Sequence, residues 1–172
     1  EFAGVKKLDL VIVSHPHSDH YGGMAHILQR FDCDLVLMPQ IDESMINDKS
    51  AYALFMRTVE KRNIELRSPV IGEKFRLADN ASLKILSPIR TDYEDLNDVS
   101  IMARYEHGEN SFLFTGDVGF EAEYDIIDSG ADIDELAAYA NEIKSRTIHL
   151  FTVNDLNHLH RGGRLSKMSA VL

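Results

Sequence analysis

A short apolar segment that runs directly into a histidine-rich loop constrains this chain more than any other feature. Residues Leu8–Ser14 form a near-continuous apolar run with β-branched residues near its end, which predicts a strand buried on both faces. The loop His15–His20 follows at once, and its Pro16 cannot donate the hydrogen bond that strand pairing requires. The pattern therefore predicts a strand whose carboxyl end presents a polar loop to a crevice.

The loop carries the spacing His15-x-His17-x-Asp19-His20. Imidazole nitrogen and carboxylate oxygen are ligands for zinc, and for manganese or iron where more oxygen ligands are present. Two alternating histidines alone are more often ordinary surface or core residues. Because Asp19 and His20 are added, after an apolar strand and before Gly22-Gly23, we favour a metal site. His15 and His17 can hold one ion while Asp19 and His20 turn towards a second.

The rest of the chain alternates between strand-like and helix-like patterns, which predicts an α/β fold. His107–Asn110 is a turn signal between two alternating runs, so a β-hairpin is expected there. The expected strands after the first are Leu35–Met38, Ile64–Leu66, Val70–Leu77, Leu83–Leu86, Val99–Tyr105, Ser111–Thr115 and Thr147–Val153. The expected helices begin after Gly22-Gly23, with Met24, Ile27 and Leu28 facing the core, and span Asp48–Arg62, Glu121–Asp128 and Asp132–Ser145.

Composition narrows the class of protein. The chain has 172 residues, 28 acidic and 18 basic, for a formal net charge of −10. This balance argues against a sequence-independent nucleic-acid binder, although a nuclease could take its positive charge from metal ions.

Cys33 is the only cysteine, which excludes an internal disulfide and a multi-cysteine zinc site. Neither a membrane span nor a signal peptide is predicted, and the cytoplasm is the default location.

A second polar residue group follows the expected hairpin. Gly116-Asp117 comes directly after the strand Ser111–Thr115. An aspartate after Thr-Gly at a strand end is commonly a turn former or a helix N-cap. From its local sequence alone, a turn is the favoured interpretation of Asp117.

These motifs resemble those of a known superfamily. Residues Leu8–Gly23 look like the second motif of the metallo-β-lactamase superfamily, and Ser111–Asp117 is similar to its later Gly-Asp motif. Together with the stretch Asn97–Ser100 and a following glutamate, Glu121 or Glu123, the chain most resembles the nuclease-like domain of ComEC-type DNA-uptake proteins. The resemblance implies an α/β fold with an αββα sandwich and a cleft for two metal ions.

The resemblance also implies roles for individual residues. His15 and His17 would ligate the first ion, Asp19 and His20 the second, and Asp117 would lie between them. Asp19 and Asp117 are the expected catalytic residues, and Asn97 and Ser100 are the expected substrate-binding residues. Two divalent ions, zinc first with manganese or iron as alternatives, would activate a water molecule. Attack on a phosphodiester such as DNA is implied by the resemblance alone.

The chain departs from that family pattern in three places. In the family, the opening strands of the fold come before the position of Leu8, and a His-His-Gly-Ser motif follows the helix after the Gly-Asp motif. We recognise neither feature in this sequence. Asn97 and Asp98 stand where most of the superfamily has a histidine. We therefore expect an incomplete sandwich in residues 1–153 and a polar tail in residues 154–172. A non-catalytic remnant, and a thioester or lactone hydrolase of the same superfamily, remain the alternative functions.

Overall fold

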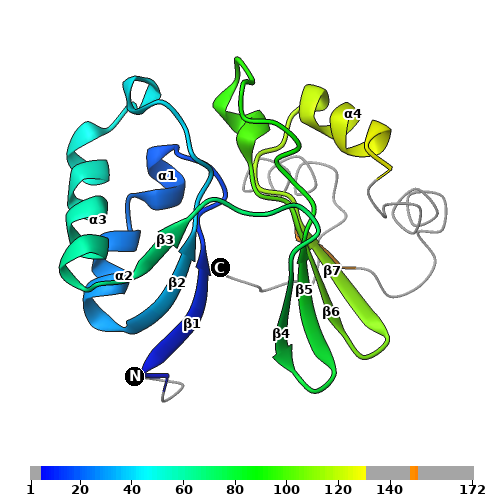
Figure 1. Ribbon diagram of the computed structural model, residues 1–172, viewed down its shortest axis with the longest axis horizontal. Helices are drawn as coiled ribbons and strands as arrows, with labels where there is room; N and C mark the ends of the chain where they lie inside the picture. Colours follow the sequence, from blue (N-terminus) through cyan, green and yellow to red (C-terminus); the bar gives the residue numbers. More distant parts are fainter. Residues whose placement is uncertain (1–4, 131–147, 151–172) are drawn as a thin grey trace, which may run out of the picture.

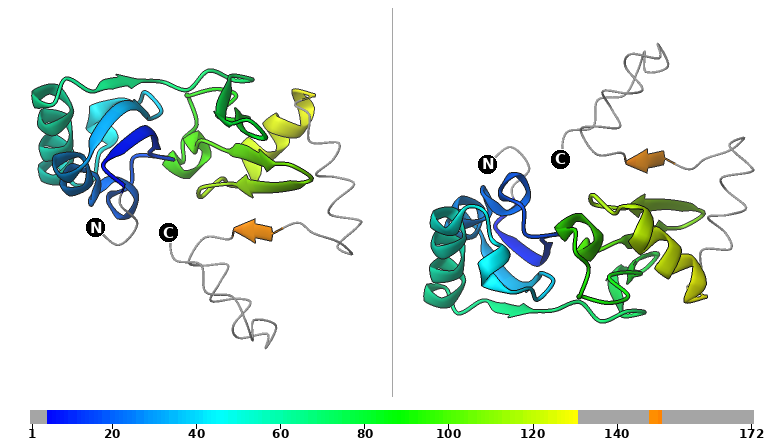
Figure 2. Two further views of the ribbon diagram at one scale, coloured as in Figure 1. Left: turned by 90° about the horizontal axis from the view of Figure 1, so that it is seen from below. Right: turned by 90° about the horizontal axis from the view of Figure 1, so that it is seen from above.

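The computed structural model describes residues 5–130 and the backbone of 148–150. Two sheets lie face to face, and helices cover the outer face of each (Figure 1). Figure 2 shows the resulting order of layers, helix, sheet, sheet and helix, from two further sides. The expected mixed α/β sandwich is confirmed.

The first sheet contains parallel strands in the order β1 (Lys7–Ile12), β2 (Asp32–Leu37) and β3 (Glu65–Arg67). Its outer face is covered by α1 (Ser18–Tyr21), α2 (Met24–Arg30) and α3 (Lys49–Lys61). Helix α3 begins where the Asp48 side chain accepts hydrogen bonds from the backbone N–H groups of Ser50 and Ala51. Phe55 and Val59, one turn apart, then face the sheet.

The second sheet has the order β4 (Lys74–Ala78), β5 (Ala81–Ile85), β6 (Ala103–His107), β7 (Asn110–Phe114) and β8 (Ile148–Leu150). Neighbouring strands are antiparallel from β4 to β7, and β8 is parallel to β7. The expected hairpin is confirmed, and Gly108 at its turn has a φ of 58°. Helix α4 (Phe120–Asp128) covers the outer face, and short 3-10 helices are η1 (Glu43–Met45) and η2 (Leu96–Val99).

Alternating side chains divide the apolar interior into layers. In β1 and its continuation, Val11 and Val13 contact the helices, whereas Leu10 and Ile12 contact the second sheet. Leu37, Ile85 and Ile101 lie in the layer between the sheets. A third cluster joins the second sheet to α4 through its buried Ile126. Both faces of β1 are therefore packed, as expected, but its apolar residues Leu8, Leu10, Val11 and Ile12 are only half-buried because β1 forms an edge of the described sheet.

Three local expectations need correction. The strand expected over Val99–Tyr105 begins only at Ala103, because Val99 ends the 3-10 helix η2. Ile27 was expected to face the core but is 37% exposed, because Ala25 and Leu28 define the buried side of α2. The strand expected from Val70 begins only at Lys74, since residues 70–73 form a turn in which Glu73 N donates to Val70 O. The helix expected over 132–145 and the tail expected over 154–172 lie outside the described residues. Within the described part of the chain, no helix has the length and apolar character needed to cross a bilayer.

Candidate metal centre

The histidine loop begins just after β1, at a point where the backbone is hydrogen-bonded to both sheets. Beyond β1, Val13 N still donates to Leu37 O of the first sheet at 2.9 Å. One residue later, Ser14 O accepts from Ile101 N, on the segment that leads into β6, at 2.8 Å. The loop His15–His20 is thus held at the line where the two sheets meet.

His15 lies against both of the other histidines of the loop. His15 is fully buried, and its Nε2 lies 2.9 Å from His17 Nδ1. The ring centroid of His15 is 4.0 Å from that of His20. His20 lies on the single turn of α1, whose N-cap is His17, so the turn brings its ring back over His15. The three imidazoles, with His15 in contact with the other two, offer a set of nitrogen atoms of the kind that binds metal cations.

Asp117 reaches this cluster from the second sheet. Gly116 has a φ of 58°, in the left-handed region that favours glycine, and its backbone is pressed against Ser100 and Ser14. A Cβ at Gly116 would lie 2.9 Å from Ser100 Cβ and 3.0 Å from Ser14 Cβ. The turn directs Asp117 Oδ2 to within 3.5 Å of His20 Nε2. Residues from both sheets therefore converge on one point.

The converging groups fit a metal ion. His15, His20 and Asp117 each offer a ligand atom, and these atoms all lie within 4.8 Å of one another. Asp117 Oδ1 is buried and has no hydrogen-bond partner among the residues that the structure describes. A buried carboxylate oxygen without a donor is destabilising, and a cation satisfies it. Burial, reinforced by neighbouring His20 and His17, lowers the pKa of His15 to about 3, so its ring stays neutral and able to bind metal at pH 7.

The other expected ligands lie at the margin of this cluster. His17 contacts His15 but is not part of the group of His15, His20 and Asp117. Asp19 Oδ2 lies 3.7 Å from His20 Nε2, and its side chain is 79% exposed. Both residues are therefore adjacent to the centre, with Asp19 directed mainly towards solvent.

The two residues expected to bind substrate differ in their surroundings. Ser100 is fully buried, and its Oγ accepts a hydrogen bond from Asp117 N at 3.2 Å. Its hydroxyl thus holds the turn that carries Asp117. Asn97 lies on η2, and its Oδ1 is a buried atom without a hydrogen-bond partner in the described part of the chain.

Asp98 is a further site residue, whose role the sequence analysis missed. It is buried, and its Oδ1 accepts from Gly119 N at 2.8 Å and from Ala122 N at 3.4 Å. Asp98 therefore caps the first turn of α4, where Gly119 has no side chain to do so. Burial, together with the charge of Asp98, raises the pKa of Glu123 in the same turn. In the sequence, only the place of Asp98 within the stretch Asn97–Ser100 pointed to it.

A guanidinium group fastens α4 from the other side. Arg90 donates to Asp125 at 2.8 Å and to Asp92 at 3.0 Å, and it also pairs with Glu121. Its guanidinium carbon lies 4.0 Å from the centre of the Tyr93 ring. Hydrogen bonds from Arg90 lower the pKa values of Asp92 and Asp125. The helix that follows the Gly-Asp turn is thus held at its first turn by Asp98 and further along by Arg90.

A cavity of about 580 Å³ opens beside the centre, lined by His17, Met45, Glu94, Asp95 and Leu96. Its walls come from the histidine loop, η1 and the segment around η2. Of the three histidines, only His17 lines the cavity, so a small molecule in it would meet the edge of the centre at His17. Its two carboxylates supply negative charge, so positive charge for an anionic substrate would have to come from bound ions.

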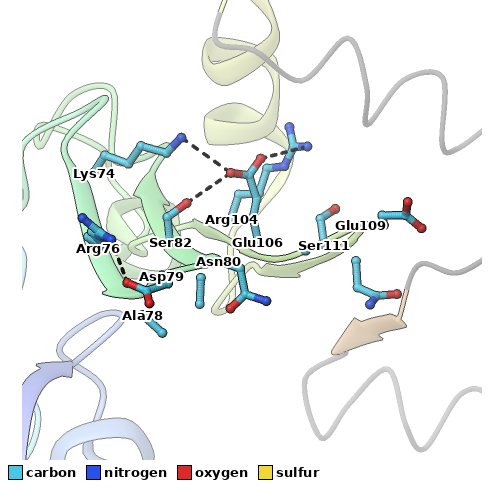
Figure 3. Close-up of a pocket in the computed structure, with 13 residues that line it drawn as sticks. Lys74, Arg76, Ala78, Asp79, Asn80, Ser82, Arg104, Glu106, Glu109 and Ser111 are labelled. Atoms are coloured by element: carbon cyan, nitrogen blue, oxygen red, sulfur yellow. Dashed lines mark hydrogen bonds and ion pairs between the residues drawn. The ribbon is translucent and has the colours of Figure 1, made fainter.

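A second cavity, of about 600 Å³, lies at the opposite end of the second sheet, where the hairpins turn (Figure 3). It contains three basic and three acidic side chains, and pairs such as Arg76 with Asp79 at 2.8 Å and Lys74 with Glu106 at 3.6 Å join them. Positive and negative charges therefore balance within this cavity, and it is separate from the metal centre.

The sequence matches the profile of the metallo-beta-lactamase superfamily over residues 1–155. The chain belongs to this superfamily, whose fold the two packed sheets and outer helices display. The histidine loop and the Gly-Asp turn, recognised separately in the sequence, occupy one centre in the folded chain.

Curated relatives match parts of the chain. ComE operon protein 3 of Bacillus subtilis is 23% identical over 124 residues, 72% of this chain and 15% of that protein. Ribonuclease J of Synechocystis is 27% identical over 94 residues, 49% of this chain and 15% of that protein. A DegV domain-containing protein of Halalkalibacterium halodurans is 45% identical over 47 residues, 27% of this chain and 17% of that protein. The chain thus spans less than a fifth of each relative's length.

Among solved structures, the chain is similar to CmlA, a diiron β-hydroxylase from Streptomyces venezuelae. The TM-score is 0.44 at 21% sequence identity, and the match covers 68% of this chain and 22% of CmlA.

Proposed function

We propose that this chain is the metal-binding part of a metallo-hydrolase that uses two divalent ions, zinc in the first instance. The observation that carries the proposal is the convergence of His15, His20 and Asp117 around the buried, unpartnered Asp117 Oδ1. A buried carboxylate oxygen without a donor is costly, and a cation held by it and the neighbouring imidazole nitrogens would remove that cost. Manganese or iron would suit the same site if more oxygen ligands take part.

The proposed ligands divide between the ions as their positions suggest. His15 and His17, in contact through Nε2 and Nδ1, would hold one ion. His20 and Asp19 would hold the other ion, and Asp117 would be shared between the two ions. The Asp19 side chain is exposed and can therefore turn inwards. Asp19 and Asp117 are therefore also the proposed catalytic residues. The bound ions would lower the pKa of a water molecule and polarise the bond to be cleaved.

The residues around the centre would position the substrate. The cavity beside His17 would receive the reacting group. Asn97, which follows the lining residue Leu96 in the sequence, is the proposed substrate-binding residue there, although its Oδ1 is buried. Ser100 would contribute to substrate binding indirectly, because its hydroxyl is buried and holds the Asp117 turn. Each of these residues lies on the short segment between Glu94 and Ser100 or on the loop that faces it.

A phosphodiester is the proposed substrate class. The likeness to ComE operon protein 3 and to ribonuclease J supports nucleic acid as the substrate. Glu94 and Asp95 in the cavity, and the net charge of −10, mean that the ions alone would attract the phosphate. Binding of such a substrate would therefore depend entirely on metal occupancy.

Metal analysis of the purified chain tests the proposal first. Near two equivalents of zinc or manganese are expected, and His15→Ala with His17→Ala should abolish most of this binding. The matched control is His26→Ala with His107→Ala, which removes two exposed histidines outside the centre. If the His15 and His17 variant retained all its metal, the site assignment would be wrong.

Substrate class is tested next with the metal-loaded chain. Cleavage of bis(p-nitrophenyl) phosphate is expected, and it should disappear when a chelator removes the ions. Cleavage of a thioester or lactone instead would indicate another hydrolase of the superfamily. Full metal binding without any cleavage would leave a non-catalytic remnant as the function.

A further inference from the structure

Ser14 is in contact with two of the three histidines at once. Its Oγ lies 3.2 Å from His15 Nδ1, in the next residue, and 3.2 Å from His20 Nδ1, on the turn of α1. One hydroxyl group therefore lies between two rings that the proposed function assigns to different ions.

The position of this hydroxyl is fixed from several sides. Ser14 O accepts the Ile101 N–H across the line between the sheets at 2.8 Å. The Gly116 backbone lies so close that a Cβ there would be 3.0 Å from Ser14 Cβ. The side chain is thus held between β1, the segment leading into β6 and the Gly-Asp turn, which leaves its hydroxyl little freedom to move away from the rings.

Hydrogen-bond chemistry then restricts the tautomers of both rings. A hydroxyl oxygen can accept two hydrogen bonds, one from each Nδ1–H. In that arrangement both rings keep a lone pair on Nε2. His15 Nε2 faces His17 Nδ1 at 2.9 Å, and His20 Nε2 faces Asp117 Oδ2 at 3.5 Å. A ring that instead accepted the Ser14 proton at Nδ1 would carry its hydrogen on Nε2 and could not bind a metal there.

We propose that Ser14 is a positioning residue that holds the Nδ1–H groups of both His15 and His20 and so prepares their Nε2 atoms for two different ions. The inference rests on the proposed function, since it concerns the same centre. A histidine that ligates a metal usually donates its other N–H to a fixed acceptor, and loss of that acceptor typically lowers metal affinity about 10–100-fold. Because Ser14 contacts both rings, its removal should weaken the binding of both ions.

Tautomers in the metal-free wild-type chain provide the first test. Long-range ¹H–¹⁵N NMR correlations at pH 8 should show His15 and His20 in the Nδ1–H form, whereas the exposed His26 should show the mixture typical of free imidazole. This measurement needs neither a variant nor a metal. If either His15 or His20 carried its hydrogen on Nε2, the proposal would be overturned.

Zinc affinity provides the second test, by competition with a chromophoric chelator. Ser14→Ala should weaken both binding steps about 10–100-fold, and Ser18→Ala, in the same loop, should leave both unchanged. Thermal unfolding of the metal-free variants confirms that they fold. Weakening of one step only, or of neither, would contradict the shared role of Ser14. A wild-type chain that bound no zinc would refute the proposed function. The tautomers of His15 and His20 would then be the test of the positioning role of Ser14.

Discussion

Ser100 Oγ accepts a hydrogen bond from the backbone N–H of Asp117 at 3.2 Å. This bond joins the segment just before β6 to the turn just after β7. Ser87 continues the connection, since its Oγ donates to Ser100 O at 2.6 Å and accepts from Met102 N at 2.7 Å. Asp117 is therefore positioned by the packing of the second sheet. Its direction towards His20 does not depend on contacts within the histidine loop.

Replacement of Gly116 by alanine should destabilise the chain and weaken metal binding. The left-handed backbone costs an alanine about 1–2 kcal/mol, and the new Cβ would overlap Ser100 and Ser14 at 2.9 and 3.0 Å. Urea unfolding and zinc titration measure the two effects. Gly108→Ala is the matched control, because Gly108 has the same φ of 58° but no neighbour within 4 Å of a Cβ. Equal losses in the two variants would show that the close packing at Gly116 is unimportant.

Asp98→Ala should lower the free energy of unfolding by about 0.5–2 kcal/mol, the usual effect of removing a helix cap. The reason is that Gly119 N and Ala122 N would lose their acceptor inside a buried region. Asp98→Asn keeps one acceptor oxygen and should lose less. Asp95→Ala serves as the control, since the exposed Asp95 caps only η2. A change no larger than that of Asp95→Ala would refute the capping role.

The free energy of unfolding of the metal-free chain should decrease as the pH is lowered from 6.5 towards about 3, because the buried His15 resists protonation in this range. In the folded chain burial keeps the pKa of His15 at about 3, whereas the ordinary value is 6.5. Between these values the unfolded chain binds more protons, so the free energy of unfolding decreases as the pH falls. His15→Gln should flatten this dependence, measured by urea unfolding from pH 4 to 7. His26→Gln is the control, and equal slopes for His15→Gln and wild type would contradict the prediction.

Arg90→Met should destabilise the chain at pH 7 and much less at pH 3. Hydrogen bonds from Arg90 lower the pKa values of Asp92 and Asp125, so the stability they contribute is present above about pH 4 and is lost as these carboxyls become protonated. Methionine keeps most of the side-chain volume. Arg76→Met, which removes an exposed pair with Asp79, should have little effect at either pH. A loss for Arg90→Met that did not depend on pH would indicate packing alone.

Features that depend on neighbouring residues could be predicted from the sequence. The apolar run before His15, the helix expected over Asp48–Arg62 and the turn at Gly108 each carry their cause within a few positions, and the corresponding elements lie close to the expected ones. The histidine loop was found for the same reason, because its candidate ligands fall within six residues. The expected link to Asp117 came from family resemblance, since no local spacing joins two loops on different sheets.

Features that depend on packing between distant segments could not be predicted. Asp98 caps a helix that begins far along the chain, whereas the sequence rule for a cap looks at the residue before the helix, here Gly119. The contacts of Ser14 with two imidazoles depend on where α1 places His20. Similarly, the exposure of Ile27 follows from the side on which α2 meets the sheet, which periodicity over seven residues does not determine.

The centre lies on the line between the two sheets, and this location affects how the domain is completed. A chain in which one sheet had formed alone would present the histidines or Asp117, but never both, and such a half-site holds ions poorly. Under the proposed function, ion uptake would therefore be reserved for chains that have finished folding. Bound ions would in turn act as a clamp across the junction, so that chelation should loosen the contact between the sheets before it disturbs the interior of either one.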